Sequence, residues 1–203
     1  MASDVLKIAL IVGSTRPNRF ADVPARWVVD AAAARHDFAL EVVDLRDWPL
    51  PFYNDPKTAL AHGVYSDPTV DRWRQKVGEF DGYLATAAEY NHGPTAVLKN
   101  AFDWAHFEWN QKPVSYIGYG GVGGARAIEH LRMVAVELRM APTKHAVHIG
   151  MEPFIGILLQ GKTLDDYAHL VTARTAMFDE LVWWARALRT AREATVEVDS
   201  IAA

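Results

Sequence analysis

The chain has 203 residues, of which 50% are hydrophobic, and a formal net charge of −4. This length and apolar content fit one domain with a substantial core, which we expect to span residues 1–203 and to end in a flexible tail at 193–203. The net charge provides no basic surface for nucleic acid, and the absence of cysteine excludes disulfides, thiolate metal sites and iron–sulfur clusters, so any redox chemistry must belong to a bound cofactor.

Short apolar runs alternate with longer segments of helical period along the chain. The apolar runs predict strands at residues 5–12, 40–45, 82–87, 114–119 and, more weakly, 145–149. The helical periods predict helices at residues 20–35, 68–78, 94–108, 125–140 and 164–192. Pro24 and Pro94 suit the first turns of two of these helices, where no N–H is needed. Such alternation gives an α/β fold, and we expect five parallel strands in the order 2-1-3-4-5 with helices on both faces.

Residues 47–67 interrupt this alternation. The segment is rich in Pro, Asp and Asn and has no clear period, which is typical of an irregular surface excursion. A lid or a contact with a second subunit can use such a segment.

A polar loop follows the first predicted strand. Ser14, Thr15 and Asn18 supply hydrogen-bond donors, and Arg16 and Arg19 supply positive charge next to the N-terminus of a predicted helix. This combination predicts an anion-binding loop. Because the loop has neither the G-x-G-x-x-G pattern nor a Gly-Lys-Ser/Thr ending, a terminal monophosphate fits it better than a pyrophosphate or a triphosphate. The alternative is an ordinary helix cap with two solvated arginines.

A second polar loop follows the third predicted strand. Tyr90 offers an aromatic face, Asn91 brings both a donor and an acceptor, and the backbone of Ala88 and Glu89 can pair with ring nitrogens and carbonyls. These groups suit a flat heteroaromatic ring. The alternative is that Glu89 merely charges the surface, Asn91 shapes the turn and Tyr90 covers the core. His92 has no second ligand at metal-binding spacing, so we expect a loop residue and no metal site.

Glycine dominates a third loop, after the fourth predicted strand. Gly120, Gly121, Gly123 and Gly124 let backbone approach a ring without interference from Cβ, or let the chain adopt positive φ. A flexible turn is the alternative reading of this pattern. Because parallel strands end at one edge of the sheet, we expect all three loops to converge on one crevice.

Four motifs carry a resemblance to a known family: GSTRPNR at 13–19, EYN at 89–91 with LKN at 98–100 and DW at 103–104, KP at 112–113, and GGVGGAR at 120–126 with HLR at 130–132. Over about residues 7–149 the chain resembles the NADPH-dependent FMN reductase family of flavodoxin-like proteins. The resemblance implies a flavodoxin-like three-layer sandwich that holds FMN non-covalently. It implies phosphate contacts from Ser14 to Phe20 and ring contacts from residues 88–91 and from Gly118, Tyr119, Gly120 and Gly121.

The same resemblance implies an activity. Members of the family reduce flavins, quinones, azo dyes or chromate with NAD(P)H, so we expect NADPH or NADH as the donor and a small planar molecule as the acceptor. The nicotinamide would stack on the exposed flavin face and leave before the acceptor binds, a ping-pong order that depends on orientation and requires no catalytic acid or base from the protein. Two alternatives are a flavodoxin-type electron carrier, against which the net charge of −4 argues mildly, and a non-redox protein that binds another phosphorylated ligand.

We also expect a homodimer or a homotetramer in the cytoplasm. Family members usually form dimers or pairs of dimers, and the 7 tryptophans exceed what one small core comfortably hides. Trp104, Phe107 and Trp109 are therefore expected near a partner subunit, whereas Trp183 and Trp184 belong to the core or to a dimer surface. No apolar run reaches the roughly 20 residues of a membrane span, and the start of the chain lacks the pattern of a secretory signal.

Overall fold

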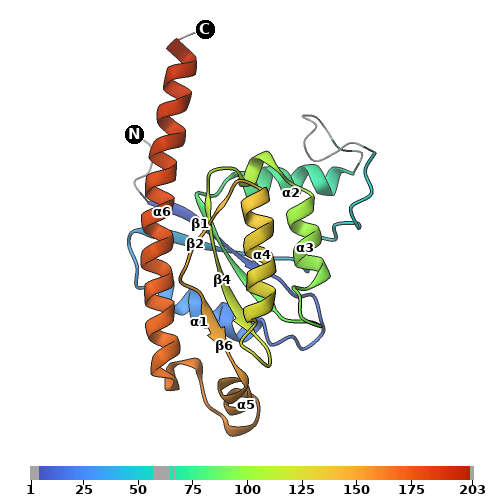
Figure 1. The fold of residues 1–203 in the computed structure, drawn as a ribbon, viewed down its shortest axis with the longest axis vertical. Helices are drawn as coiled ribbons and strands as arrows, with labels where there is room; N and C mark the ends of the chain where they lie inside the picture. The colour runs from blue at the N-terminus through green and yellow to red at the C-terminus, as the bar shows by residue number, and fades with distance from the viewer. Residues whose placement is uncertain (1–4, 57–64, 66, 202–203) are drawn as a thin grey trace.

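A parallel sheet forms the centre of the computed structural model, which describes residues 5–56, 65 and 67–201 (Figure 1). Its strands are β1 (Leu6–Val12), β2 (Phe38–Asp44), β3 (Gly82–Ala88), β4 (Pro113–Tyr119), β5 (Ala141–Pro142) and β6 (Val147–Ile149). They run in the order β2-β1-β3-β4-β5, with β6 also paired to β4. The predicted order 2-1-3-4-5 is confirmed.

The sheet has six strands rather than the expected five because its outer strand is split. β5 pairs with the start of β4, and β6 pairs with its end. The N–H groups of Ala141 and Thr143 donate to the carbonyls of Lys112 and Val114, so the nitrogen of Pro142 faces away from β4. Between the two short strands a side chain takes over, because Ser115 Oγ donates to the carbonyl of His145 at 2.7 Å. The predicted strand at 145–149 corresponds to β6, and β5 was not predicted.

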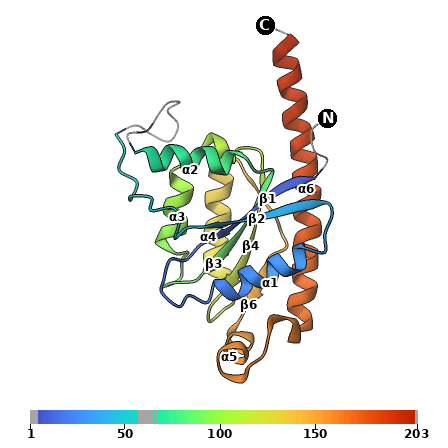
Figure 2. The same ribbon diagram turned by 180° about the vertical axis from the view of Figure 1, so that it is seen from behind.

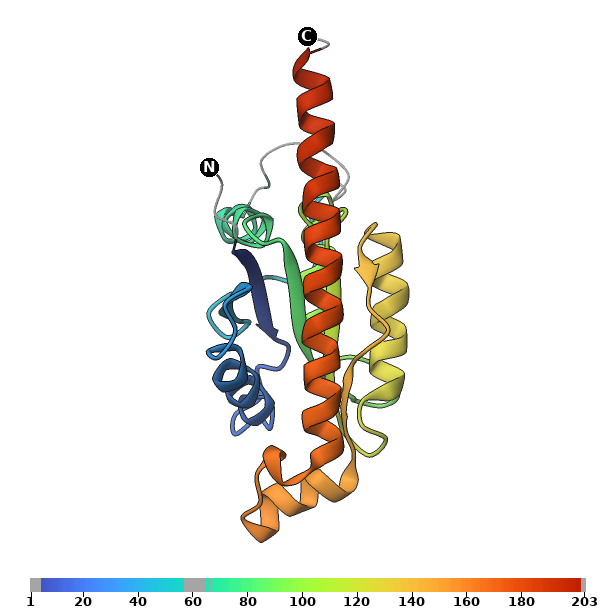
Figure 3. The ribbon, with the colours of Figure 1, turned by 90° about the vertical axis from the view of Figure 1, so that its left-hand side faces the viewer.

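Helices cover both faces of the sheet. α2 (Pro68–Gly78), α3 (Ala96–Asp103), α4 (Ala125–Glu137) and the short helix η1 (Phe107–Trp109) contribute to one core cluster. α1 (Asp22–Ala32), the short helix η2 (Leu164–Asp166) and α6 (Ala168–Ile201) contribute to the other. Figure 2 shows α1 crossing its face of the sheet, and Figure 3 shows α6 running the height of the molecule and past the sheet.

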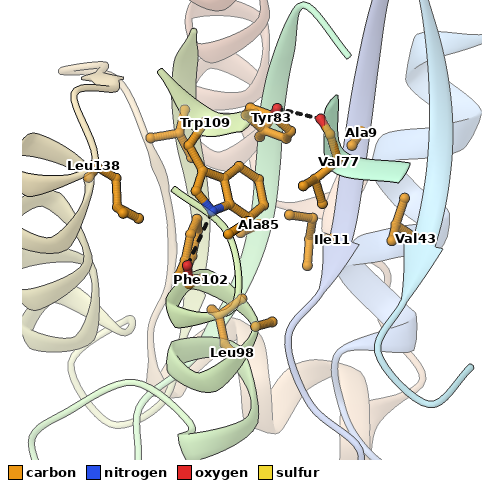
Figure 4. Close-up of a cluster of buried hydrophobic side chains, with 14 of the residues drawn as sticks. Ala9, Ile11, Val43, Val77, Tyr83, Ala85, Leu98, Phe102, Trp109 and Leu138 are labelled. Carbon is orange, nitrogen blue, oxygen red and sulfur yellow. Dashed lines mark hydrogen bonds between the residues drawn. The ribbon is translucent and has the colours of Figure 1, made fainter. Parts of the chain in front are cut away.

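Large aromatic side chains fill the core between the sheet and α2, α3 and α4. Trp104 and Trp109 are 1% and 0% exposed, so the expectation that they lie at a subunit surface is wrong. Their indole N–H groups reach backbone carbonyls. Trp104 donates to Pro51 at 2.6 Å. Trp109 donates to Phe102 at 3.2 Å, a bond drawn in Figure 4. Tyr83 likewise donates its hydroxyl to the carbonyl of Val77 at 2.6 Å. These three buried side chains thus keep an acceptor for each polar hydrogen.

Several predicted element boundaries differ from the structure. Thr95 is the N-cap of α3, and its hydroxyl accepts from Leu98 N at 3.2 Å, so Pro94 precedes the helix instead of occupying its first turn. Pro24 does lie in the first turn of α1. α5 (Met151–Gln160) was not predicted. α6 continues to Ile201, so the segment from residue 193 that was expected to be a flexible tail has helical backbone that far.

Candidate functional site

The three polar loops meet at the carboxyl edge of the sheet, as expected for parallel strands. They enclose a cavity of about 150 Å³ together with one side chain from α5. Its lining residues are Arg16, Arg19, Phe20, Ala88, Glu89, Tyr90, Tyr119, Gly120 and Phe154. Every residue in this list except Phe154 was predicted from the sequence.

The loop after β1 presents unpaired donors. The backbone N–H groups of Thr15, Arg16, Asn18 and Phe20 have no acceptor among the residues that the structure describes. The Arg16 side chain is exposed, and its guanidinium carbon lies 5.8 Å from the centre of the Tyr90 ring. Unpaired N–H groups beside an exposed cation are suited to a phosphate group.

Arg19 is turned away from solvent and holds this loop in place. Its guanidinium forms a two-pronged contact with Asp44, donates to Asp22 at 2.7 Å, and donates to the carbonyl of Ser14 at 2.5 Å. Hydrogen bonding to Asp44 raises the pKa of Arg19. Burial alone would raise the pKa of Asp44, but the contacts with Arg19 and Arg46 keep it below its ordinary value. Arg19 therefore holds the backbone of the loop at Ser14, and the phosphate contact expected from its side chain stays a prediction.

The loop after β3 folds back on itself as a tight turn. Tyr90 and Gly93 exchange two backbone hydrogen bonds, at 2.9 and 3.1 Å. Between them Asn91 and His92 have φ of 50° and 76°, the left-handed conformation that primed hairpin turns require. Tyr90 is 38% exposed, and its hydroxyl lies 3.4 Å from Ser14 Oγ. The turn therefore presents an aromatic face next to the anion-binding loop.

Glu89 is buried, contrary to the alternative that it merely charges the surface. Its side chain is 4% exposed and forms an ion pair with Arg126 at the start of α4. One carboxylate oxygen accepts from Arg126 Nε at 2.6 Å, and the other accepts from Arg126 N at 3.1 Å. Burial favours a higher pKa for Glu89, but hydrogen bonds from Arg126 and from the backbone of Ala127 lower it. The carboxylate stays ionised and joins the second loop to the third.

The glycine loop combines close packing with an open edge. A Cβ on Gly118 would lie 2.4 Å from the carbonyl of Gly123, and a Cβ on Gly124 would lie 2.6 Å from Tyr119 N. Gly120 has φ of 141°, and a Cβ there would lie 3.3 Å from Glu89 Cβ. Nothing described lies within 4 Å of a Cβ on Gly121. Gly118 is thus required by packing, whereas Gly121 leaves backbone accessible to a ligand.

A second, larger cavity adjoins the first and shares Arg16 and Tyr90 with it. It has a volume of about 400 Å³ and is also lined by Ser14, Thr15, Leu50, Phe52, Thr95, Ala96, Val97 and Asn100. Phe52 belongs to the predicted excursion at 47–67, of which residues 57–64 and 66 lie outside the described part of the chain. The excursion therefore supplies one wall of the cavity.

This wall is held in place by Asn100 of α3 and by Trp104, the C-cap residue of that helix. Asn100 donates to the carbonyl of Pro51 at 2.8 Å and accepts from Tyr53 N at 3.0 Å. Trp104 donates to the same carbonyl of Pro51, and its ring centre lies 4.8 Å from that of Tyr53. These contacts fix the backbone on both sides of Phe52, whose side chain remains exposed.

Sequence reasoning missed several residues of the site. Phe154 reaches the smaller cavity from α5 and stacks at 4.5 Å from Phe20, whose ring in turn lies 5.3 Å from that of Tyr119. Arg126 was noted in the sequence as part of the GGVGGAR motif and as the start of a helix, but its contact with Glu89 was not predicted. Asn91, Asn18 and Gly121 line neither cavity directly, although they shape or flank the loops that do.

The donor set fits FMN. Unpaired N–H groups and Arg16 suit its phosphate, and Tyr90 with Gly120 in the cavity wall and the exposed Gly121 suits its planar ring. Among the described residues no three His, Asp or Glu side chains gather closely enough to hold a metal ion. No described helix has the length and apolarity that crossing a membrane requires.

Comparisons with known proteins agree with this geometry. The model of the NADPH-dependent FMN reductase family matches residues 6–153. An NAD(P)H-dependent FMN reductase of Schizosaccharomyces pombe is 35% identical over 152 residues, which cover 73% of this chain and 76% of that protein. A 2-hydroxy-1,4-benzoquinone reductase of Burkholderia sp is 37% identical over 142 residues, covering 66% of this chain and 72% of that protein.

A solved structure supports the same relationship. The flavoenzyme NAD(P)H:(acceptor) oxidoreductase FerB from Paracoccus denitrificans superposes with a TM-score of 0.70 at 25% identity. The match covers 90% of this chain and 98% of that chain. The parallel sheet with helices on both faces is therefore the flavodoxin-like fold that the motifs implied.

Proposed function

The chain belongs to the NADPH-dependent FMN reductase family and is an FMN-dependent NAD(P)H oxidoreductase, and we propose that its physiological acceptor is a quinone or a free flavin. The observation that supports flavin binding most directly is the loop at 14–20, predicted to bind an anion, beside the cavity lined by Tyr90 and Gly120. The relatives named as quinone reductases point to the quinone class of acceptor.

We propose that the phosphate of FMN binds the free N–H groups of the first loop together with Ser14 and the Arg16 side chain. Arg19 positions that loop through the carbonyl of Ser14. The ring is proposed to contact residues 88–91 and the glycine loop at 118–121. When bound, FMN would supply the redox chemistry between the nicotinamide and the acceptor, while the protein binds and orients the two substrates.

The donor and the acceptor are proposed to use the same space in turn. The cavity of about 400 Å³ next to Tyr90 lies at the low end of the range for small-molecule sites, roughly 300–1,000 Å³. We infer a ping-pong order, with the nicotinamide leaving before the acceptor enters.

An anaerobic reduction experiment tests the proposal. The FMN-loaded protein should lose its flavin absorbance on addition of NADPH or NADH and regain it on addition of a quinone such as 1,4-benzoquinone. Bound FMN that no reduced nicotinamide bleaches would support the electron-carrier alternative. A protein that stays colourless after incubation with FMN would support a non-redox ligand.

We also propose that the chain forms a homodimer or homotetramer. Exposed apolar side chains on α4 and α5 support this, notably Met133, Val136 and Leu159, which are 73%, 64% and 79% exposed. Sedimentation at micromolar concentration should give at least the mass of a dimer. A fully active monomer would exclude an obligatory second subunit.

A cytoplasmic location is proposed from the reaction. The enzyme needs a continuous supply of NADPH or NADH, which the cytoplasm regenerates. Fractionation of cells with an antibody to the protein tests this, and enrichment in a membrane or secreted fraction would contradict it.

A further inference from the structure

The ion pair between Glu89 and Arg126 joins two of the loops proposed to contact the flavin ring. Glu89 lines the smaller cavity, and its backbone N–H donates to the carbonyl of Tyr119 at 3.1 Å. Its carboxylate accepts two hydrogen bonds from Arg126 at the N-terminus of α4. Arg126 follows directly after the glycine loop, so one buried side chain fixes the spacing between residue 89 and residues 120–125.

The two partners differ in exposure. The Glu89 side chain is 4% exposed, whereas the Arg126 side chain is 43% exposed. Water therefore screens the guanidinium in part but hardly reaches the carboxylate. If Arg126 were absent, the carboxylate would be a poorly solvated negative charge in the cavity wall.

We propose that Glu89 and Arg126 act together as positioning residues that set both the geometry of the ring-binding loops and the reduction potential of the bound FMN. This inference rests on the proposed function, because it requires the flavin ring to lie against Glu89 and Gly120. A balanced pair adds little net field at the ring, whereas either partner alone leaves one full charge beside it.

The direction of each effect follows from the charge that reduction adds. FMN takes up two electrons and one proton at neutral pH and so gains negative charge. Arg126→Gln leaves the carboxylate of Glu89 unbalanced and should lower the midpoint potential. Glu89→Gln leaves the guanidinium unbalanced and should raise it. The double variant has neither charge and should return close to the parent value.

The experiment measures the FMN dissociation constant and the midpoint potential of bound FMN for the parent and for all three variants. Each single variant should change the ratio of affinities for reduced and oxidised FMN about tenfold, which equals about 30 mV for a two-electron couple. Arg126→Lys keeps the charge and should keep the parent potential even if FMN binds somewhat less tightly.

A remote ion pair provides matched controls. Arg35 pairs with Asp179 at 2.6 Å and with Asp37 at 2.7 Å near the opposite edge of the sheet, where β2 begins. Arg35→Gln and Asp179→Asn make the same changes of charge and should leave the potential unchanged. Thermal unfolding of each apoprotein checks that the variants fold.

The outcomes separate this inference from the proposed function. Potentials that shift in opposite directions and cancel in the double variant would support it. Two results would indicate a purely structural pair: potentials that shift in the same direction in both single variants, or a potential of the double variant that lies further from the parent value than that of either single variant. Either result would overturn the inference while the parent remains an active reductase. A parent that binds no FMN would overturn the proposed function itself.

Discussion

Two arginines in one loop, Arg16 and Arg19, have opposite environments at the scale of single residues. Arg16 is exposed, whereas Arg19 is buried against Asp44 and Asp22. The sequence predicts a cationic loop because both residues follow the first strand closely. It does not predict which cation is free, because Asp44 lies 25 positions away and its contact with Arg19 depends on the pairing of β1 with β2.

Arg16→Ala should weaken FMN binding about 10- to 100-fold, because a hydrogen bond to a charged group contributes about 1.5–3 kcal/mol. Riboflavin lacks the phosphate and should bind the parent and the variant alike. Fluorescence titration of the apoprotein with both flavins measures this, with Arg26→Ala on the exposed side of α1 as a control for net charge. An equal loss of riboflavin affinity would show that Arg16 contacts another part of the flavin.

Asp44→Asn should destabilise the protein by about 3 kcal/mol at pH 7, because it leaves Arg19 buried without its main partner. In the parent, the pKa of folded Asp44 lies below its ordinary value, so this stabilisation is complete above the unfolded pKa of about 3.9 and is lost as the pH falls below it. Urea unfolding measures the free energy of unfolding at pH 7 and at about pH 3, and this free energy should fall less in the variant than in the parent. An equal fall in both proteins would mean that other carboxylates account for it.

At the scale of elements, the buried strands were the easiest to predict. β1, β3 and β4 are covered on both faces and therefore read as continuous apolar runs. α5 was missed because Met151–Gln160 is apolar around most of its circumference and contains Pro153 and Gly156. Gly156 is required by packing, since a Cβ there would lie 2.0 Å from the hydroxyl of Tyr167, a contact that no sequence pattern reveals.

Gly118 in β4 and Gly121 in the loop that follows it should respond differently to the same substitution. Gly118→Ala places a Cβ 2.4 Å from the carbonyl of Gly123 and should destabilise the apoprotein by about 1–3 kcal/mol, as overpacking usually does. Gly121→Ala meets nothing described within 4 Å and should change stability by less than about 0.5 kcal/mol. Thermal unfolding of the apoproteins measures both. If Gly121 contacts the ring, as proposed, its variant should lose FMN affinity without losing stability.

At the scale of the whole molecule, the site is made by elements that meet only in the folded sheet. β1, β3 and β4 each deliver one loop to the carboxyl edge, and the excursion after β2 adds the wall at Phe52. At the opposite edge, Arg192 of α6 pairs with Asp81 at 3.2 Å and donates to the carbonyl of Gln111. The fold class and the converging loops could be predicted from the sequence, whereas the contact with Phe154 depends on a helix that the sequence did not reveal.

Steady-state kinetics should reflect the limited room beside Tyr90. Because one cavity of about 400 Å³ serves both substrates in the proposal, double-reciprocal plots of NADPH against a quinone should be parallel. High quinone concentrations should also inhibit competitively against NADPH. Intersecting lines without such inhibition would show that both substrates bind together and that the donor and acceptor have separate places.

The split outer strand bears on how the chain behaves in a crowded solution. An unbroken edge strand offers a neighbouring molecule a row of free N–H and carbonyl groups on which to add its own strand, which is a route to fibrils. Here that edge consists of two residues at Ala141–Pro142, the second of them a proline, and three at Val147–Ile149, with the exposed Lys144 between the two strands. The edge next to β4 is thus too short and too interrupted to template another chain. Aggregation through the sheet would have to begin at the β2 edge, where Glu41 places a negative charge beside the exposed Val42.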